Sequence, residues 1–271
     1  MKRWITVMSG VLAVTAAAAP VSAQTTAVNT RSTTANTRTT AANTQVAPID
    51  PVAALTARFA ANRGVTIAEI SRTSSGGKPL SAQKRRGVAQ FDAAGVTGYD
   101  ILTASALPGE TTKPVRSLAI GGNVYTSGGL VGEGLPDGRK WMRAPGKIRD
   151  LSPFQTPVLV LEPATLKALL ATSKAKKPGA ALHTGTITLG ALYRVSPSYR
   201  ADLRGRPSAR VAATTVAWRL WLGRDGLPSR LVTSWTEPPA SMKVTRVSDV
   251  RFASWGKAVN LTAPLGEEPA V

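Results

Sequence analysis

The chain has 271 residues, with 34 Lys and Arg against 15 Asp and Glu, one His and no Cys. The absence of Cys excludes disulfide scaffolds, thiolate metal sites and Cys nucleophiles, and the single His183 excludes multi-His metal sites. The net charge of +19 favours a polyanionic partner, such as nucleic acid, an anionic lipid surface or an acidic cell-wall polymer. A hydrophobic share of 43% is too high for a disordered chain of this length.

The first residues have the pattern of an export signal. Residues 1–23 begin with Lys2 and Arg3, continue with an apolar run over 5–19 and end on a small-residue cleavage site at 21–23. The run is shorter than the roughly 20 apolar residues that a membrane-spanning helix needs, although an uncleaved anchor is the alternative. No Cys follows the signal, so we expect a secreted or cell-envelope protein that is not lipid-anchored.

A spacer follows the signal. Residues 24–47 are mostly Thr, Ala and Asn, a composition that cannot bury enough apolar surface to offset the entropy of ordering. We expect either a disordered segment or a glycosylated stalk. Four of the cations and none of the acids lie in residues 1–47, so residues 48–271 keep 30 cations against 15 acids, a net +15.

The first half of residues 48–271 is mainly strand material. Asp50 and Pro51 suit a helix start, and Asn62-Arg63-Gly64 suits its end. Paired glycines at 121–122 supply the positive φ that a hairpin turn needs. Strands are expected at 65–70, 87–91, 99–106, 115–120, 123–127 and 140–143, with a loop at 132–138.

The second half alternates fewer helices with longer strands. Leu166, Leu169 and Leu170 have helical spacing after Pro163, and Pro178-Gly179 would stop that helix. A short helix is expected at 199–203. Strands are expected at 183–195, 211–222, 228–236, 244–255 and 259–263. Long antiparallel strands with few interposed helices predict an α+β fold around one large sheet, because a parallel α/β fold would alternate helix and strand.

No pattern in the chain indicates catalysis. His183 has neither a nucleophile elbow nor an orienting carboxylate near it in sequence, and the glycines of 121–134 are turn glycines because no helix follows them as dinucleotide binding requires. The carboxylates that we considered are scattered and suggest no glycosidase pair; they are Asp92, Asp100, Glu133, Asp137, Asp225 and Asp249. We therefore expect no enzyme, no metal and no cofactor.

Basic runs indicate an anionic partner. Because the chain is expected to be exported, lipid headgroups or wall polymers are favoured over nucleic acid; a merely solvated basic surface is the alternative. The residues expected to meet an anionic headgroup or surface are Lys84, Arg85, Arg86, Lys174, Lys176 and Lys177.

The late strands carry apolar side chains on one face that could exceed what the expected helices cover. The excess would line a pocket for an apolar ligand, whereas the alternative is an ordinary filled core. The residues expected to line such a pocket are Leu118, Ile120, Ile187, Leu189, Trp218, Leu220, Leu231 and Phe252.

The motifs of 48–271 resemble a known superfamily. Trp221-Leu222-Gly223-Arg224-Asp225-Gly226-Leu227-Pro228-Ser229-Arg230 is followed by Phe252-Ala253-Ser254-Trp255-Gly256-Lys257, and Ile120-Gly121-Gly122-Asn123-Val124-Tyr125 and Trp141 precede them. This order resembles the LolA-like lipid-carrier superfamily, especially the actinobacterial LppX/LprG-type lipid-binding proteins. The lipidated Cys of that group is missing here.

The resemblance implies a half-open β-barrel, a large curved antiparallel sheet with helices packed on its concave face and an apolar pocket between them. It also implies a role in holding or carrying acylated lipids or glycolipids. We therefore expect a secreted lipid-binding protein. The alternative is a secreted cationic protein with a filled core that binds anionic wall polymers or a protein partner.

Overall fold

The structure is a computed structural model that describes residues 49–146, 154–174, 181–203, 205–237, 243–265 and 267–269. Residues 46–271 form one compact unit. The predicted signal peptide and spacer lie outside the described residues, as do Lys176 and Lys177. None of the helices in the described ranges is long and apolar enough to cross a membrane.

Six helices and twelve strands make up the described residues. The helices are α1 (Pro51–Thr56), α2 (Gly129–Glu133), α3 (Pro163–Ala171), α4 (Leu189–Val195), α5 (Pro197–Asp202) and α6 (Ala209–Ala212). The strands are β1 (Arg63–Ser75), β2 (Lys78–Asp92), β3 (Gly95–Leu107), β4 (Glu110–Thr111), β5 (Val115–Ile120), β6 (Asn123–Gly128), β7 (Trp141–Pro145), β8 (Leu182–Thr188), β9 (Thr215–Leu222), β10 (Pro228–Thr236), β11 (Val244–Ala258) and β12 (Glu267–Pro269).

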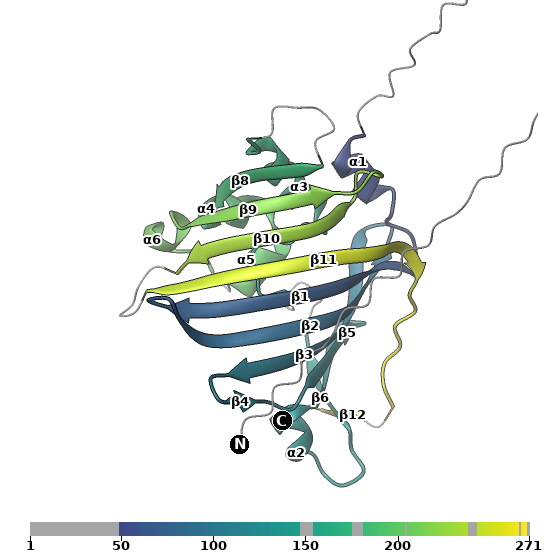
Figure 1. Cartoon of the computed structure of the whole chain (residues 1–271). Coiled ribbons are helices and arrows are strands. Elements are labelled where there is room, and N and C mark those ends of the chain that lie inside the picture. The colour runs from purple at the N-terminus through teal and green to yellow at the C-terminus, as the bar shows by residue number, and fades with distance from the viewer. Residues whose placement is uncertain are drawn as a thin grey trace, which may run out of the picture. The chain divides into compact units, whose positions relative to one another are not determined.

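All strands belong to one open sheet. Its order is β12-β7-β6-β5-β3-β2-β1-β11-β10-β9-β8, with β4 paired to β3. Every pair is antiparallel except β12 with β7. The sheet twists, so that β5 and β6 run steeply to β9–β11, and α3, α4 and α5 lie behind it in Figure 1. The predicted fold class, an α+β curved antiparallel sheet with helices on its concave face, is confirmed.

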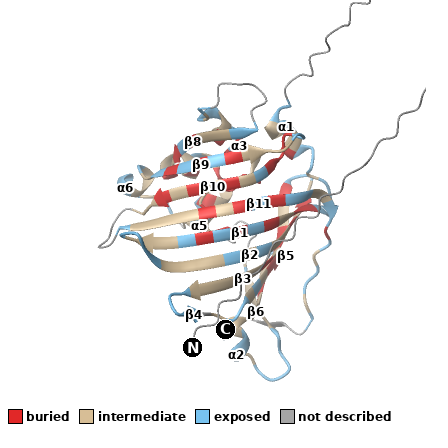
Figure 2. Cartoon of the chain, in the orientation of Figure 1, coloured by how far each residue is buried: buried red, intermediate tan, exposed pale blue. Residues whose placement is uncertain are grey.

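The two faces of the sheet differ in chemistry. The concave face carries Val65 and Ile67 of β1, which are fully buried. In β9 buried residues alternate with exposed ones, and in β10 and the middle of β11 they alternate with residues that are partly or fully exposed. Figure 2 shows this alternation in β9 and β10. Alternation follows from the period-two geometry of a strand with one face against a core and the other toward water.

The hydrophobic core lies between the concave face and the helices. It combines side chains of the central strands with the segment 154–161 and with Leu166, Leu169 and Leu192 of α3 and α4. Strands β5 to β7 contribute only Ala119 to this core cluster. The core packing is therefore concentrated along the part of the sheet from β3 to β8 in the strand order, and is sparse from β5 to β7.

Several predicted elements are confirmed in place. The hairpin of β5 and β6 closes on Gly121 (φ 60°) and Gly122 (φ 76°). The hairpin of β9 and β10 forms around the Asp225-Gly226 turn, where Leu227 N donates to Asp225 Oδ1 at 3.2 Å. Asp50 caps α1 as expected, by accepting from Val52 N at 2.9 Å.

Other predicted elements are wrong in extent or type. The strand expected over 183–195 ends at Thr188, whose hydroxyl accepts from Ala191 N at 3.1 Å and so caps α4, which begins at Leu189. The strand expected over 211–222 begins at Thr215, because Ser208 caps the short helix α6 before it. These caps satisfy the free amides of a first helical turn, and alternation alone does not reveal them.

The two ends of the folded unit also differ from prediction. Helix α1 ends at Thr56 and not at 62. No strand forms over 259–263; there Leu261 N donates to the side chain of Gln90 at 2.7 Å, which replaces a strand partner. The last strand is instead β12, which pairs with β7 at the far edge of the sheet. The short helix expected at 199–203 forms as α5, and α2, α4 and α6 form in addition to the expected helices.

Candidate functional site: a cavity on the concave face

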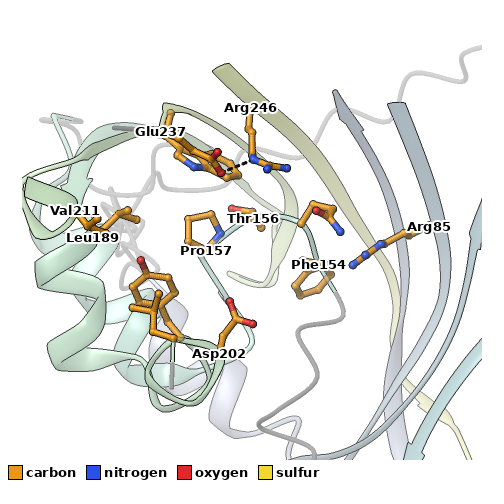
Figure 3. A pocket seen from close by; sticks show the side chains of 13 residues that line it. Arg85, Phe154, Thr156, Pro157, Leu189, Asp202, Val211, Glu237 and Arg246 are labelled. Carbon is orange, nitrogen blue, oxygen red and sulfur yellow. Dashed lines mark hydrogen bonds and ion pairs between the residues drawn. The ribbon is translucent and has the colours of Figure 1, made fainter. Parts of the chain in front are cut away.

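A cavity of about 700 Å³ opens between the concave face and the helical layer. Its volume lies within the roughly 300–1,000 Å³ of small-molecule pockets. Figure 3 shows side chains that converge on it from the sheet, from the helices and from the segment 154–157. The residues that line it are Arg85, Phe154, Gln155, Thr156, Pro157, Leu189, Tyr199, Asp202, Leu203, Val211, Trp235, Glu237 and Arg246.

The segment 154–157 forms one wall and is fixed by polar contacts to the sheet. Gln155 N donates to the carboxylate of Glu69 at 2.9 and 3.1 Å. The hydroxyl of Thr233 in β10 donates to Thr156 Oγ1 at 2.8 Å, with both side chains buried. Phe154 packs edge-on against Phe252 at 5.9 Å between ring centroids. Contacts with β1, β10 and β11 therefore fix the position of this wall.

Below this wall, a buried carboxylate lies beside a largely buried cation. Glu69 of β1 is 2% exposed and directly faces Arg85 of β2 in the sheet register. Burial raises the pKa of the Glu69 carboxyl, against the opposing effects of the Ser248 hydroxyl, the Arg85 charge and the Gln155 amide. Ser248 Oγ donates to Glu69 Oε1 at 2.6 Å. The carboxylate is therefore bound by β11, through Ser248, and by the wall, through Gln155.

Arg85 lacks such partners. It forms no ion pair and no hydrogen bond within the described part of the chain, and its Nε is buried without a partner. Burial lowers the pKa of the guanidinium, and the charge of Glu69 opposes that shift. The buried Gln83 Oε1, two positions away on the same face of β2, also lacks a partner. Unsatisfied buried polar atoms are rare and costly in folded proteins. Of these two residues only Arg85 borders the cavity, so its guanidinium is where an acidic ligand group would be stabilised.

The cavity also has a polar edge and an apolar side. Arg246 Nε of β11 donates to Glu237 Oε1 at 2.6 Å, and both side chains are partly exposed. Apolar side chains from the helical layer face this pair across the cavity, as Figure 3 shows for Leu189 and Val211. An elongated ligand with one acidic end and an apolar body would match this lining.

Only one residue of the predicted pocket lining borders this cavity. Leu189 does, from the first turn of α4 rather than from a strand. Leu118 is buried but lies on the opposite face, since it pairs with Asp100 while Ala119 and Tyr99 enter the core, and Ile120 is half-buried at the end of β5. The remaining predicted residues pack within the filled core and are Ile187, Trp218, Leu220, Leu231 and Phe252.

The predicted cations divide between the two faces of the sheet. Arg85 enters the cavity, whereas its neighbours Lys84 and Arg86 are exposed on the convex face. Lys174 is exposed after α3, away from the residues that line the cavity. The run 84–86 is thus not one cationic patch, because successive residues of a strand point to opposite faces.

The alternation of side chains along the strands could have singled out Glu69 and Arg85. Glu69 is in phase with Val65 and Ile67, and Arg85 is in phase with Ala89 and Phe91, so each is a charge at a position where the pattern expects an apolar side chain. Charged residues are almost never fully buried unless they are paired. Helix positions such as Tyr199 and Val211 carried no comparable signal.

The other candidate groups form no recognisable catalytic arrangement. The ring of His183 contacts Ser173 Oγ through Nδ1 at 3.3 Å, and no carboxylate in the described residues contacts that ring. Across the same residues, no cluster of three or more His, Asp or Glu side chains is arranged to hold a metal ion.

Comparisons with known proteins give weak matches only. No protein-family model and no curated protein matches the chain. Among solved structures, a LolA superfamily protein from Nitrosomonas europaea aligns with 79% of this chain and 93% of its own, at 8% identity and a TM-score of 0.28. A porin-like protein from Bacteroides uniformis aligns with 72% of this chain and 98% of its own, at 8% identity and a TM-score of 0.26.

A larger protein gives a partial match. Transferrin binding protein B from Neisseria meningitidis aligns over 76% of this chain at 9% identity and a TM-score of 0.24. The chain spans 27% of that protein's length.

Proposed function

We propose that this chain is an exported, non-enzymatic lipid-binding protein that holds a single acyl chain with an acidic headgroup in the concave-face cavity. The observation that carries the proposal is Arg85, a largely buried guanidinium at the cavity wall without an ion pair in the described residues. The motif resemblance to LolA-like carriers, and to the LppX/LprG group within them, supports the same class of ligand.

The two ends of the ligand would be held by different forces. Apolar side chains such as Leu189 and Val211 would bury the acyl chain, and each methylene removed from water contributes about 0.8 kcal/mol. Arg85 would bind the acid, because a guanidinium forms two parallel hydrogen bonds to a carboxylate or phosphate.

The first test is whether the protein carries lipid. Natively purified protein is extracted with organic solvent and the extract is analysed by mass spectrometry, with uptake of added oleate and lysophospholipid measured in parallel. Stoichiometric lipid or saturable uptake is expected. A lipid-free extract together with no uptake of either ligand would leave the alternative, a cationic interaction protein without a lipid ligand.

The second test concerns the headgroup. Arg85→Gln should weaken oleate binding by about tenfold or more, since a hydrogen bond to a charged group contributes roughly 1.5–3 kcal/mol, while oleyl alcohol should bind almost as before. Lys84→Gln is the matched control, because it removes the same charge one residue away on the opposite face. Equal loss for both ligands, or for both variants, would contradict the role of Arg85.

The position of the acyl chain is tested by Leu189→Arg. A cation at the start of α4 would enter the apolar side of the cavity. Oleate and oleyl alcohol should then both lose affinity, provided that the variant unfolds near the wild-type midpoint. Unchanged uptake of both ligands by a folded variant would show that the chain binds elsewhere.

A further inference from the structure

The convex face of the sheet carries a row of arginines that the sequence does not reveal. Arg230 pairs with Arg251, Arg251 with Ala68, Ala68 with Arg86, Arg86 with Leu102 and Leu102 with Arg116, so all six residues lie on one line across β10, β11, β1, β2, β3 and β5. We call the arginines on this line, Arg230, Arg251, Arg86 and Arg116, the arginine row. With strands about 4.8 Å apart, the row spans about 24 Å.

The ends of the row are held in the same way. Arg116 donates to both oxygens of Asp100 at 2.8 and 2.6 Å, and its guanidinium lies 5.4 Å from the ring centre of Trp141. Arg230 donates to both oxygens of Asp249 at 2.8 and 2.6 Å, and it lies 4.9 Å from the ring centre of Trp221. A carboxylate fork and an aromatic face fix each guanidinium and reduce the entropy it would lose on binding.

The middle of the row is left without counter-charge. Arg86 and Arg251 are exposed and form no ion pair within the described part of the chain. Arg251 lies directly opposite Arg230, but Asp249 already compensates the charge of Arg230. The two exposed guanidinium groups of Arg86 and Arg251 therefore keep their donors available for an external anion.

A groove follows part of the row. It has a volume of about 550 Å³, and its lining includes Arg86, Arg116, Leu102 and Lys257. Asp100 is the one carboxylate that borders the groove among the described residues, and it is bound to Arg116. The groove therefore presents a net positive lining that is distinct from the concave-face cavity.

We propose that the arginine row and its groove bind a linear phosphate polymer without bases, of the polyphosphodiester type found outside cells. The row runs across the strands, and β5 runs steeply to β10 in Figure 1, so a flat bilayer would not meet both ends while a flexible chain can follow them. Nucleic-acid binding would use exposed rings for stacking, but Trp221 and Trp141 lie against arginines.

The test measures binding of end-labelled inorganic polyphosphate by fluorescence polarisation at several salt concentrations. Arg86→Gln/Arg251→Gln should weaken binding about tenfold at low salt and flatten the plot of log affinity against log salt by roughly 1.4, as expected for two lost phosphate contacts. The matched control is Lys167→Gln/Arg194→Gln, which removes two exposed cations from α3 and α4. It should change affinity less than twofold.

Two further measurements complete the test. The row variant should unfold near the wild-type midpoint, because Arg86 and Arg251 are exposed and form no ion pair within the described residues. If the double variant unfolds early, Arg86→Gln alone replaces it. Equal effects of the row and control variants would overturn the proposal. So would tighter binding of phosphatidylglycerol vesicles, or of an oligonucleotide of equal charge, than of polyphosphate.

Discussion

Glu69 shows how one charged residue can organise the wall of a cavity. Its carboxylate binds the Gln155 amide and the Ser248 hydroxyl, and so connects β1 to β11 and to the segment 154–157. Removing the side chain would leave the Gln155 amide and the buried Ser248 hydroxyl without this partner, and would remove the negative charge that faces Arg85. In the proposed lipid complex, the residue would act on the ligand through the wall and through Arg85.

The raised pKa of Glu69 gives a specific dependence of stability on pH. A carboxyl whose pKa is higher in the folded than in the unfolded chain stabilises the fold below its unfolded value of about 4.5, and this contribution is lost as pH rises through the folded value. Glu69→Gln keeps an oxygen acceptor but cannot ionise. The difference in free energy of unfolding, variant minus wild type, should therefore increase as pH rises above 4.5.

Urea unfolding at intervals from pH 4 to pH 8 measures this difference. Glu110→Gln, which changes an exposed carboxylate in β4, serves as the control. A flat difference for Glu69→Gln across the same range would mean that folding does not perturb the Glu69 carboxyl.

At the scale of elements, turn chemistry was more predictable than helix starts. Gly121 and Gly122 adopt left-handed conformations in the hairpin of β5 and β6, as the paired glycines indicated. By contrast, Thr188 and Ser208 each begin a helix within sequence that alternates like a strand. Alternation in 183–195 is compatible with both structures over short windows, and the cap decides between them.

One hairpin glycine and one helix glycine give predictions of opposite sign. Gly121 (φ 60°) has open space where the Cβ of an alanine would stand, so Gly121→Ala would cost about 1–2 kcal/mol from backbone conformation alone. Gly132 lies inside α2, also with open space around it and without a positive φ. Gly132→Ala should stabilise the protein by about 0.5–1 kcal/mol.

Thermal and urea unfolding of the two variants check this pair of predictions. Gly121→Asn is a useful third variant, because Asn tolerates the left-handed region better than Ala and should recover part of the loss. If Gly121→Ala is as stable as wild type, the β5–β6 turn does not have the conformation described.

At the scale of the whole molecule, the sequence predicted the sheet but not the location of the cavity. Apolar residues such as Trp218 and Leu220 were expected to face a ligand, yet the segment 154–161 and helices α3 and α4 cover them. Alternation identifies which face of a strand is buried, not what buries it. Likewise, the arginine row depends on the register of each strand pair from β10 to β5. These two strands are more than one hundred residues apart in the chain, and their sequences do not indicate that register.

The uneven core predicts uneven local stability along the sheet. Strands β9, β10 and β11 each place at least two side chains in the core, as β1 does with Val65 and Ile67, whereas β6 and β7 place none there. Tyr125 of β6 is buried but lies outside that cluster. Because local opening is easiest where few buried apolar contacts hold a strand, β5–β7 should open without global unfolding.

Native-state hydrogen exchange, corrected for intrinsic rates, measures this gradient. Amides that pair β6 with β7 should exchange with opening free energies several kcal/mol below those that pair β10 with β11, which should approach the global free energy of unfolding. Low concentrations of urea should leave the β6–β7 amides almost unaffected, since little surface is exposed when they open. Equal protection of the amides from exchange in the two regions would show that the sheet unfolds as one unit, although β6 and β7 place no side chain in the core cluster.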